Sequence, residues 1–395
     1  MNNVRNGVHS ILLFVFLAGL VVVVIALFNG QTSGSAVPNV SPVVTPTIVG
    51  VQASPLSTPT IVNVPVARLG EPVLVHESGR VSLLKGDQQK ISLASWEGDQ
   101  MQAMLLDLST GKERKVTTAA GLLSAHTSNH WLVGEDQTPP GSSGYYSRIK
   151  VIDIDTGKEF FLGDKNTIRQ SPDISGDVVV WRDWRNRDRS GTDIYAYDLK
   201  TGKEFPVVAT NSWELEPRIS GQWVTYLTLA TQYRPGEAPN TIELRAHSLK
   251  TGEDFSIGMI PSPNNASWGT YHAIDGDKVA WIKVTNATWG QYSSEPHLYD
   301  LTTQTDRQLA EPIQNGAPTD VSLSAKGEIV VYSSPSVRWV VVDWHPSTPV
   351  VIPVKAPQKV WGDSLLVSGN YLVWTIYLNR EVTDVQLFTQ QITRP

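Results

Sequence analysis

A short motif of the form Asp-x-x-Thr-Gly recurs along this chain about every 45 residues, and this repeat constrains the fold more than any other feature. The copies, some of them degenerate, begin at Asp107, Asp153, Asp198, Ser248, Asp300 and Asp343. An Asp side chain accepts hydrogen bonds from the backbone N–H groups that follow it, and Gly adopts positive φ without steric cost. Each copy therefore predicts a tight reversal between two strands.

A second marker, a small or polar residue before an apolar run, divides the chain into seven units. It stands at Gly79, Asn129, Gly176, Gly221, Gly276, Gly327 and Gly369. Five residues after the later markers comes an aromatic residue that we expect in the core: Trp181, Tyr226, Trp281, Tyr332 and Trp374. Four short strands per unit at this period indicate an all-β, seven-bladed β-propeller. Six blades are the alternative, because the units at Gly79 and Asn129 are the least regular.

The last unit leaves only a stub, residues 391–394, for its fourth strand. An unpaired strand edge is a site for aggregation, so propellers need a way to close the ring. Residues 60–66 form an apolar, strand-like piece before the first unit. The sequence therefore predicts that residues 60–66 pair with the last blade.

One unit carries the most specific pattern: Ser-Pro-Asp-Ile-Ser-Gly at 171–176, Val-Val-Trp at 179–181, and Thr-Asp-Ile-Tyr-Ala-Tyr-Asp-Leu-Lys-Thr-Gly-Lys at 192–203. This pattern resembles the TolB-like β-propeller repeats of bacterial and archaeal cell-surface proteins, and the resemblance covers most of residues 70–395. It implies the propeller fold. It implies no single function, because such repeats occur in translocation proteins, surface adhesins and a few polysaccharide lyases.

The N-terminal region predicts a membrane anchor. Residues 11–28 are apolar and uncharged, and as a helix they would span roughly 27 Å, close to the thickness of a bilayer core. The alternative is a signal peptide cleaved near the weak site at residues 33–36. We expect a short cytoplasmic segment at 1–10, a transmembrane helix at 11–28, a Pro-rich disordered linker at 29–65, and an extracytoplasmic propeller at 66–395.

Composition excludes several function classes. The net charge is −6, so general nucleic-acid binding is not expected, and the absence of Cys excludes disulfides, thiolate metal sites and a lipid-modified cysteine. The chain has no P-loop, dinucleotide fingerprint or Gly-x-Ser-x-Gly elbow. The only closely spaced histidines are His126 and His130, and in a strand-rich chain that spacing does not bring both rings together as it would on a helix. We predict no catalytic residues, no metal and no cofactor.

Aromatic and Arg side chains gather in the loops between the second and third strands of the units, which we place at residues 183–192, 229–241 and 283–296. Such side chains are typical of recognition surfaces. The candidate ligand-binding residues in these loops are Trp184, Arg185, Arg187, Tyr233, Trp289 and Tyr292. Three further candidates, Trp213, Trp268 and Trp361, each precede a marker Gly by eight residues. These three indoles either rim the channel mouth or pack between blades.

The sequence therefore predicts a membrane-anchored, extracytoplasmic propeller that acts as a non-catalytic binding or scaffold module for cell-envelope glycan or protein. The alternative is a propeller enzyme acting on polysaccharide, either a lyase or a glycoside hydrolase. An enzyme would need acid and base groups that converge within a few ångströms. Loop aromatics without such a cluster favour binding.

Overall fold

The computed structural model describes residues 67–77, 80–87, 89–97, 100–116, 122–137, 146–163, 168–229, 242–260, 271–288, 291–309, 313–314, 321–323, 328–333, 339–343, 350–352, 365–378 and 385–393. All strands lie within Val62–Pro395, whereas the unit Met1–Ile61 lies outside the described residues. The described residues include no helix that could cross a membrane, and the apolar stretch 11–28 is not among them. The predicted anchor at residues 11–28 and the predicted linker at residues 29–65 both lie outside the described residues.

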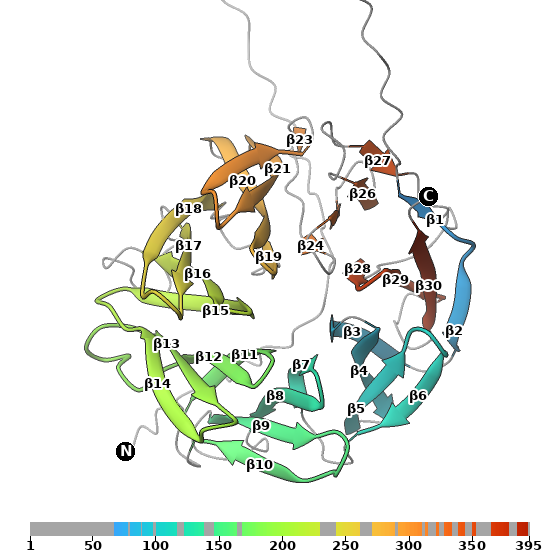
Figure 1. Cartoon of the computed structure of the whole chain (residues 1–395), viewed down its shortest axis with the longest axis horizontal. Coiled ribbons are helices and arrows are strands. Elements are labelled where there is room, and N and C mark those ends of the chain that lie inside the picture. Colours follow the sequence, from blue (N-terminus) through green and yellow to red (C-terminus); the bar gives the residue numbers. More distant parts are fainter. Residues whose placement is uncertain are drawn as a thin grey trace, which may run out of the picture. The chain divides into compact units, whose positions relative to one another are not determined.

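The strands form seven sheets arranged in a ring, so the seven-bladed propeller predicted by the repeat is confirmed (Figure 1). Blade 1 contains β3 (Arg80–Asp87), β4 (Lys90–Glu97), β5 (Gln100–Asp107) and β6 (Lys112–Lys115). Blade 2 contains β7 (Leu122–Ser128), β8 (Trp131–Gln137), β9 (Ser147–Asp153) and β10 (Glu159–Leu162). Blade 3 contains β11 (Arg169–Ser175), β12 (Val178–Asp183), β13 (Asp193–Asp198) and β14 (Lys203–Val208). Blade 4 contains β15 (Trp213–Ser220), β16 (Trp223–Leu229), β17 (Ile242–Ser248) and β18 (Asp254–Ile260).

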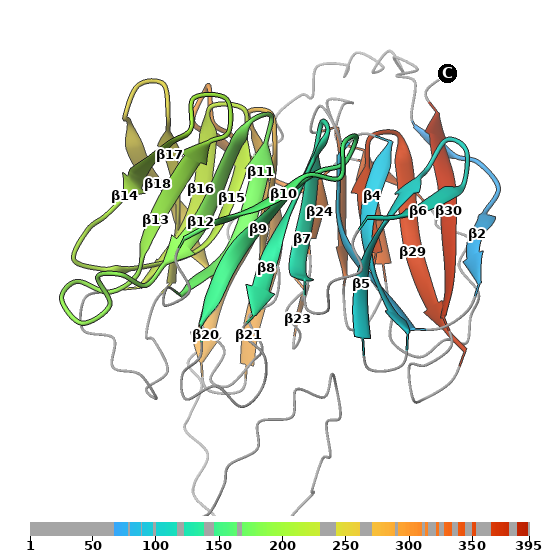
Figure 2. The same cartoon turned by 90° about the horizontal axis from the view of Figure 1, so that it is seen from below.

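The remaining blades repeat this order with two additions. Blade 5 contains β19 (His272–Asp275), β20 (Lys278–Thr288), β21 (Gln291–Asp300) and β22 (Thr305–Gln308), and the short β23 (Ile313–Gln314) also pairs with β21. Blade 6 contains β24 (Val321–Leu323), β25 (Ile329–Ser333), β26 (Trp339–Asp343) and β27 (Val350–Ile352). Blade 7 contains β28 (Leu365–Ser368), β29 (Tyr371–Tyr377) and β30 (Val385–Thr393), completed by β1 (Arg68–Leu69) and β2 (Val73–Glu77). The first strand of each blade lies nearest the centre, and the strands run through the thickness of the ring (Figures 1 and 2).

The N-terminal end of the described chain closes the ring through residues 68–77, whereas residues 60–66, which were predicted to pair with the last blade, lie outside the described residues. Arg68 pairs with Thr393, and Val73 pairs with Thr389, so β1 and β2 together occupy the outer edge of β30. The predicted stub 391–394 is largely the end of β30, the third strand of the blade. The Ala67 N–H also donates to Asp343 Oδ2 of blade 6 at 2.8 Å. The closing segment therefore ties blade 7 to its neighbour.

The first unit begins later than its Gly marker predicted. Gly79 follows the closing strand β2, whereas the first turn inside blade 1 lies between β3 and β4, at Gln89. A recurring bond identifies this turn: the apolar residue after each motif Asp donates its N–H to the second residue of the first turn of the same blade. The bonds join Leu108 to Gln89, Ile154 to His130, Leu199 to Asp177, Leu249 to Gln222 and Leu301 to Asp277. Sequence spacing missed this turn because blade 1 has Gln in place of the usual Gly.

The Asp-x-x-Thr-Gly motifs form the predicted reversals between the third and fourth strands. In blade 3 the Asp198 carboxylate accepts from the backbone N–H groups of Lys200 and Thr201, at 2.8 and 3.1 Å. Gly202 then turns the chain with φ at +68°. The degenerate copy at Asp300 makes the same two bonds, and Gln304 takes the positive-φ position there.

Serine hydroxyls link neighbouring blades at the end of the first strands. Each Ser accepts a hydrogen bond from the N–H of the turn glycine in the next blade: Ser128 from Gly176, Ser175 from Gly221, and Ser220 from Gly276. These bonds are 2.8 to 3.0 Å long. The repeated Ser-Gly pair in the sequence is therefore a contact between blades as well as a turn.

The aromatic residues five positions after the five later markers are buried in the core, as predicted, and they lie between blades. Trp181, Tyr226, Trp281, Tyr332 and Trp374 are 0 to 3% exposed. Each belongs to an apolar cluster that joins one sheet to the next, such as the cluster of Val180, Ile194, Val208, Ile219 and Tyr226 between blades 3 and 4. The core therefore consists of a series of layers between adjacent blades.

Candidate functional site

Three of the predicted ligand-binding residues, Trp184, Arg185 and Arg187, lie in the β12–β13 loop of blade 3, and a fourth, Trp213, begins β15 of blade 4. The loop between β12 and β13 and the connection between β14 and β15 leave the sheets on the same face of the ring, because the strands alternate in direction. Hydrogen bonds within the β12–β13 loop fold it into compact turns: the N–H groups of Arg189 and Ser190 both donate to Asn186 O, at 2.9 and 3.0 Å. The Asn186 side chain donates to Asp193 Oδ2 at 2.7 Å.

Trp184 and Trp213 form a half-buried indole pair on this face. Their ring centroids lie 5.9 Å apart with an interplanar angle of 86°, a favourable edge-to-face geometry. Gly191, with φ at +112°, allows Ser212 and Trp213 to pack closely on the β12–β13 loop, since a Cβ there would lie 2.5 Å from Ser212 O and 2.9 Å from Trp213 Cδ1. Trp213 also packs against the buried cluster between blades 4 and 5. For this indole, packing between blades is therefore the better of the two predicted interpretations.

Two Arg side chains cover the Trp184 ring. The guanidinium carbons of Arg182 and Arg187 lie 4.5 and 5.1 Å from its centroid, within the range of cation–π contacts. Arg187 is exposed and has no ion pair with another described residue. An exposed guanidinium stacked on an indole can bind planar, anionic or hydroxyl-rich groups. Trp184 and Arg187 are the two predicted residues that the structure brings together as a surface.

Arg185, in contrast, is committed to its own blade. It donates to Asp183 Oδ1 from Nε at 2.9 Å, and from Nη2 to Asp183 Oδ2 and Glu204 Oε1 at 2.7 and 2.6 Å. Its guanidinium carbon lies 3.8 Å from the Tyr195 ring centroid. Burial alone would raise the pKa of Asp183, but hydrogen bonds from Arg185 and Trp181 lower it. Arg185 therefore acts as a clamp within blade 3.

The other predicted residues do not join this surface in the described structure. Four of them lie outside the described residues: Tyr233, Trp268, Trp289 and Trp361. Tyr292 belongs to strand β21. The expected loop 283–296 is wrong, because Lys283 pairs with Glu295 and Thr285 with Ser293. Strands β20 and β21 thus continue as a long hairpin. Polar residues here were read as loop, although backbone pairing in a hairpin does not require apolar side chains.

The channel wall of blades 2 to 4 holds a polar cluster that sequence reasoning missed. The first strands bulge at Ser124, Ser171 and Glu216, which have φ between +47 and +50° and coincide with breaks in register. Ser171 Oγ donates to Glu216 Oε1 in the next blade at 3.1 Å. A signal was present, since Pro172 and Pro217 follow two of these residues, and Pro inside a strand is typical of a bulge.

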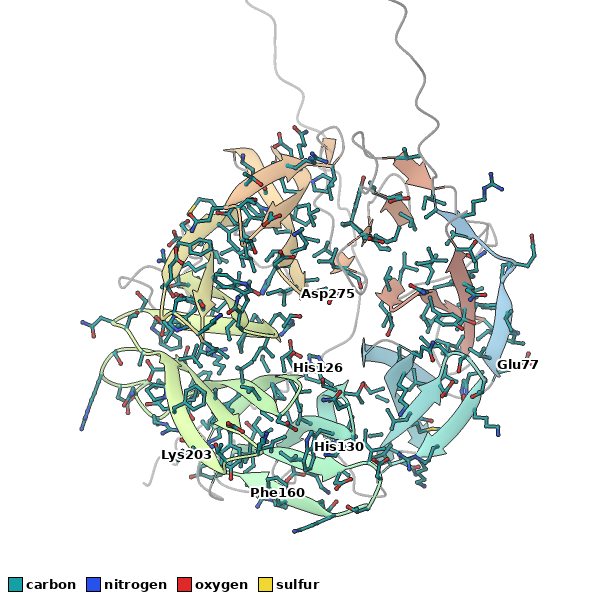
Figure 3. All side chains as sticks on the ribbon, viewed as in Figure 1. Glu77, His126, His130, Phe160, Lys203 and Asp275 are labelled. Atoms are coloured by element: carbon teal, nitrogen blue, oxygen red, sulfur yellow. The ribbon has the colours of Figure 1, made fainter. Side chains whose placement is uncertain are left out.

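Asp173 is the centre of this cluster. Its Oδ1 lies 2.8 Å from His126 Nδ1 in blade 2, and its Oδ2 accepts from the Ile219 N–H of blade 4 at 3.0 Å. One buried carboxylate thus connects three blades, and His126 lies near the central opening (Figure 3). Among the described residues, no three His, Asp or Glu side chains are placed to hold a metal ion.

Comparison with known proteins supports the fold. No protein-family model and no curated protein sequence matches this chain. An oligogalacturonate lyase from Vibrio parahaemolyticus aligns over 83% of this chain and 96% of its own, with 10% identity and a TM-score of 0.53. An oligogalacturonate lyase in complex with manganese aligns over 83% and 98%, with 12% identity and a TM-score of 0.51.

The matches also include TolB from Acinetobacter baumannii, at 14% identity and a TM-score of 0.42. This alignment covers 80% of the present chain but only 65% of the TolB chain. At these identities the likeness concerns the fold: the chain is a β-propeller of the general kind that its TolB-like repeats implied.

Proposed function

We propose that this protein is a membrane-anchored, extracytoplasmic binding or scaffold module for cell-envelope glycan or protein. The observation that carries the proposal is the surface at Trp184 and Arg187, where an indole held edge-to-face by Trp213 is covered by an exposed guanidinium. Aromatic and Arg side chains held in place by a rigid blade bind with little loss of side-chain entropy. The opposite ring of connections carries the tight motif turns, so the longer loops on this face are better suited to recognition.

Replacing Trp184 by Ala is expected to weaken binding of the full chain to isolated envelope polymers or surface proteins by about 1 kcal/mol or more. The melting temperature should change little, because Trp184 is only half-buried and lies in a loop. Pull-down titration and thermal melting measure the two effects.

Trp131→Ala is the matched control. Trp131 is also half-buried, but it begins β8 on the opposite face and donates from Nε1 to Asp177 Oδ1 at 3.0 Å. Its loss should cost stability and leave binding unchanged. Equal binding by the two variants would contradict the proposed surface.

A polysaccharide lyase or glycoside hydrolase is the second candidate, favoured by the contact of His126 with Asp173 at the channel wall and by the fold likeness to two lyases. The same purified protein can be incubated with acidic and neutral polysaccharides. Turnover that is lost in His126→Ala and kept in Trp184→Ala would favour this enzyme over a binding module.

The anchor proposal rests on the length of the uncharged stretch 11–28. We expect this stretch to remain on the mature protein, because a signal peptide usually has an apolar region of only about 7 to 15 residues. Intact mass and N-terminal sequencing of membrane-extracted protein test this expectation. A mature protein that begins near Ala36 or Val37 would instead be secreted.

A further inference from the structure

A pocket of about 480 Å³ lies between blades 3 and 4, separate from the Trp184 surface. One side is formed by the end of β14 and the connection that follows it, with the apolar Val207, Val208 and Ala209 and the hydroxyl residues Thr210 and Ser212. The other side is the face of blade 4 turned toward blade 3, which contributes the polar residues Glu214, Tyr226, Thr228, Glu243, Arg245, His247 and Asp254. The pocket therefore has an apolar strip of three residues on one side, which faces the strongly polar wall of blade 4.

The repeat position that is Arg in blade 3 is Glu in blade 4. Arg169 lies two residues before the bulge residue Ser171, and its guanidinium covers the ring of Trp181, which packs between blades 2 and 3, with its carbon 4.9 Å from the Trp181 centroid and Nη1 2.9 Å from Glu204 Oε2. Glu214 has the same place relative to the bulge residue Glu216. The shorter side chain leaves space in the next gap between blades.

The Glu214 carboxyl group is buried and only partly satisfied. Its side chain is 1% exposed, Oε1 accepts from the Thr210 hydroxyl, and Oε2 has no hydrogen-bond partner among the described residues. Burial raises the pKa of Glu214 to about 7, and the nearby Asp193 carboxylate of β13 adds to the increase despite the bond from Thr210. An unpaired buried carboxylate oxygen is costly, so a ligand that donates a hydrogen bond to Glu214 Oε2 would be stabilised there.

The single Arg in the pocket is already occupied. Arg245 donates to Asp254 Oδ1 from Nε and Nη2, at 2.9 and 2.6 Å, and to Glu243 Oε1 from Nη1 at 3.2 Å. Asp254 also accepts from the Tyr226 hydroxyl at 2.8 Å, and His247 Nδ1 lies 3.3 Å from it. Three carboxyl groups thus face one Arg and one His. The described lining therefore has more carboxyl groups than cationic side chains to pair with them.

We propose that this pocket binds a primary ammonium group carried on a small carbon framework, as in a lysine side chain or an amino sugar. The ammonium would donate to Glu214 Oε2 and to the carboxylate of Glu243, while the carbon framework would contact Val207, Val208 and Ala209. An ammonium group supplies the donors and the charge that the pocket lacks. An anionic ligand is disfavoured, because the guanidinium of Arg245 already donates to Asp254 and Glu243. The proposal does not depend on the binding surface at Trp184.

The test is calorimetric titration of the full chain with Nα-acetyl-lysine amide and with 6-amino-6-deoxyglucose, which both carry an ammonium group at pH 8, against the neutral probes Nα-acetyl-norleucine amide and glucose. We expect the ammonium probes to bind at pH 8 and the neutral probes not to bind. Binding of only one ammonium probe would support the proposal and identify the source of the group, a peptide or a glycan. Binding of neither, or equal binding of the neutral probes, would overturn it.

The affinity is expected to fall about tenfold between pH 8 and pH 6, because Glu214 takes up a proton over this range and no longer attracts the ammonium. The other titratable and charged groups that face this gap or the Glu214 carboxyl are His247, Asp193, Glu243, Asp254, Arg245 and Tyr226. The Glu214→Gln variant separates these effects, since only the contribution of Glu214 disappears.

Glu214→Gln should weaken binding at pH 8 at least tenfold and flatten its pH dependence. Its melting temperature at pH 8 should not fall, because the amide removes an unpaired buried charge. Glu243→Gln should weaken binding less, since its carboxylate is shared with Arg245. Glu216→Gln, on the same strand but outside the pocket, is the matched control and should bind like the wild type. Wild-type affinity in Glu214→Gln would contradict the proposal even if the Trp184 surface proves functional.

Discussion

Removing residues 1–77 is expected to unfold the propeller or to lower its free energy of unfolding by about 5 kcal/mol or more, a large part of what a domain has. The deletion removes β1 and β2 and leaves β30 as an exposed edge. It also removes Ala67, whose N–H bonds Asp343, and the partly buried Leu69 and Val75, which pack in two core clusters. Each lost backbone hydrogen bond costs about 0.5 to 1.5 kcal/mol, and the exposed apolar surface adds to this.

Removing only residues 1–61 is the control, since it leaves the closing strands in place. Urea unfolding of the full chain and both truncations, followed by tryptophan fluorescence, measures the difference. The shorter truncation should match the full chain. If the protein without residues 1–77 unfolds at the same urea concentration as the full chain, β30 does not need an N-terminal partner, and the ring is held together by the contacts between blades.

Replacing Trp281 by Ala is expected to cost about 3 to 5 kcal/mol of stability. The indole is 1% exposed, lies in the cluster between blades 4 and 5, and donates from Nε1 to Asp306 Oδ1 at 3.2 Å. Its six-membered ring lies directly on the backbone of β18, where a Cβ on Gly258 would be 2.4 Å from Trp281 Cη2. Truncation leaves a cavity that the rigid sheets on either side cannot fill.

Gly258, which lies against the Trp281 ring, provides a second test of this packing. Gly258→Ala should destabilise the wild type, because the new methyl group meets the indole, but should cost much less in the Trp281→Ala background, where that space is empty. Thermal unfolding of the two single variants and the double variant gives the coupling free energy directly. Additive losses would mean that Trp281 does not pack on the β18 backbone. Trp184→Ala, on the loop face, should change stability far less than Trp281→Ala.

The candidate surface was predicted only in part. Trp184 and Arg187 were identified because aromatic and Arg residues in long loops are typical of binding surfaces, and the structure does bring them together. Arg185 has the same residue type and the same loop, yet its donors go to Asp183 and Glu204. Asp183 is local, two residues before Arg185, but Glu204 comes from β14, and the sequence of the loop does not show that this second acceptor lies beside Arg185.

Local patterns determined the repeated part of this protein. The turn of Asp198 and Gly202, and the burial of Trp181 five residues after Gly176, depend on residues close in sequence, so each copy of the motif repeats the same hydrogen bonds and packing. The number of blades followed from counting such units. Where a unit lacked the marker, as in blade 1, the position of its first turn was predicted wrongly, but the propeller fold was still predicted correctly.

Only the tertiary structure decided the contacts between blades. Residues 68–77 reach β30 across the whole length of the propeller domain, and this pairing depends on where the two edges of the ring meet. His126 contacts Asp173 of the next blade, and the pocket at Glu214 is lined by residues of blades 3 and 4. These residues are far apart in the sequence, and no local pattern pairs them. Hydrophobic periodicity specifies which face of a strand is buried, but the side chain that it meets there is set by the packing of one blade on the next.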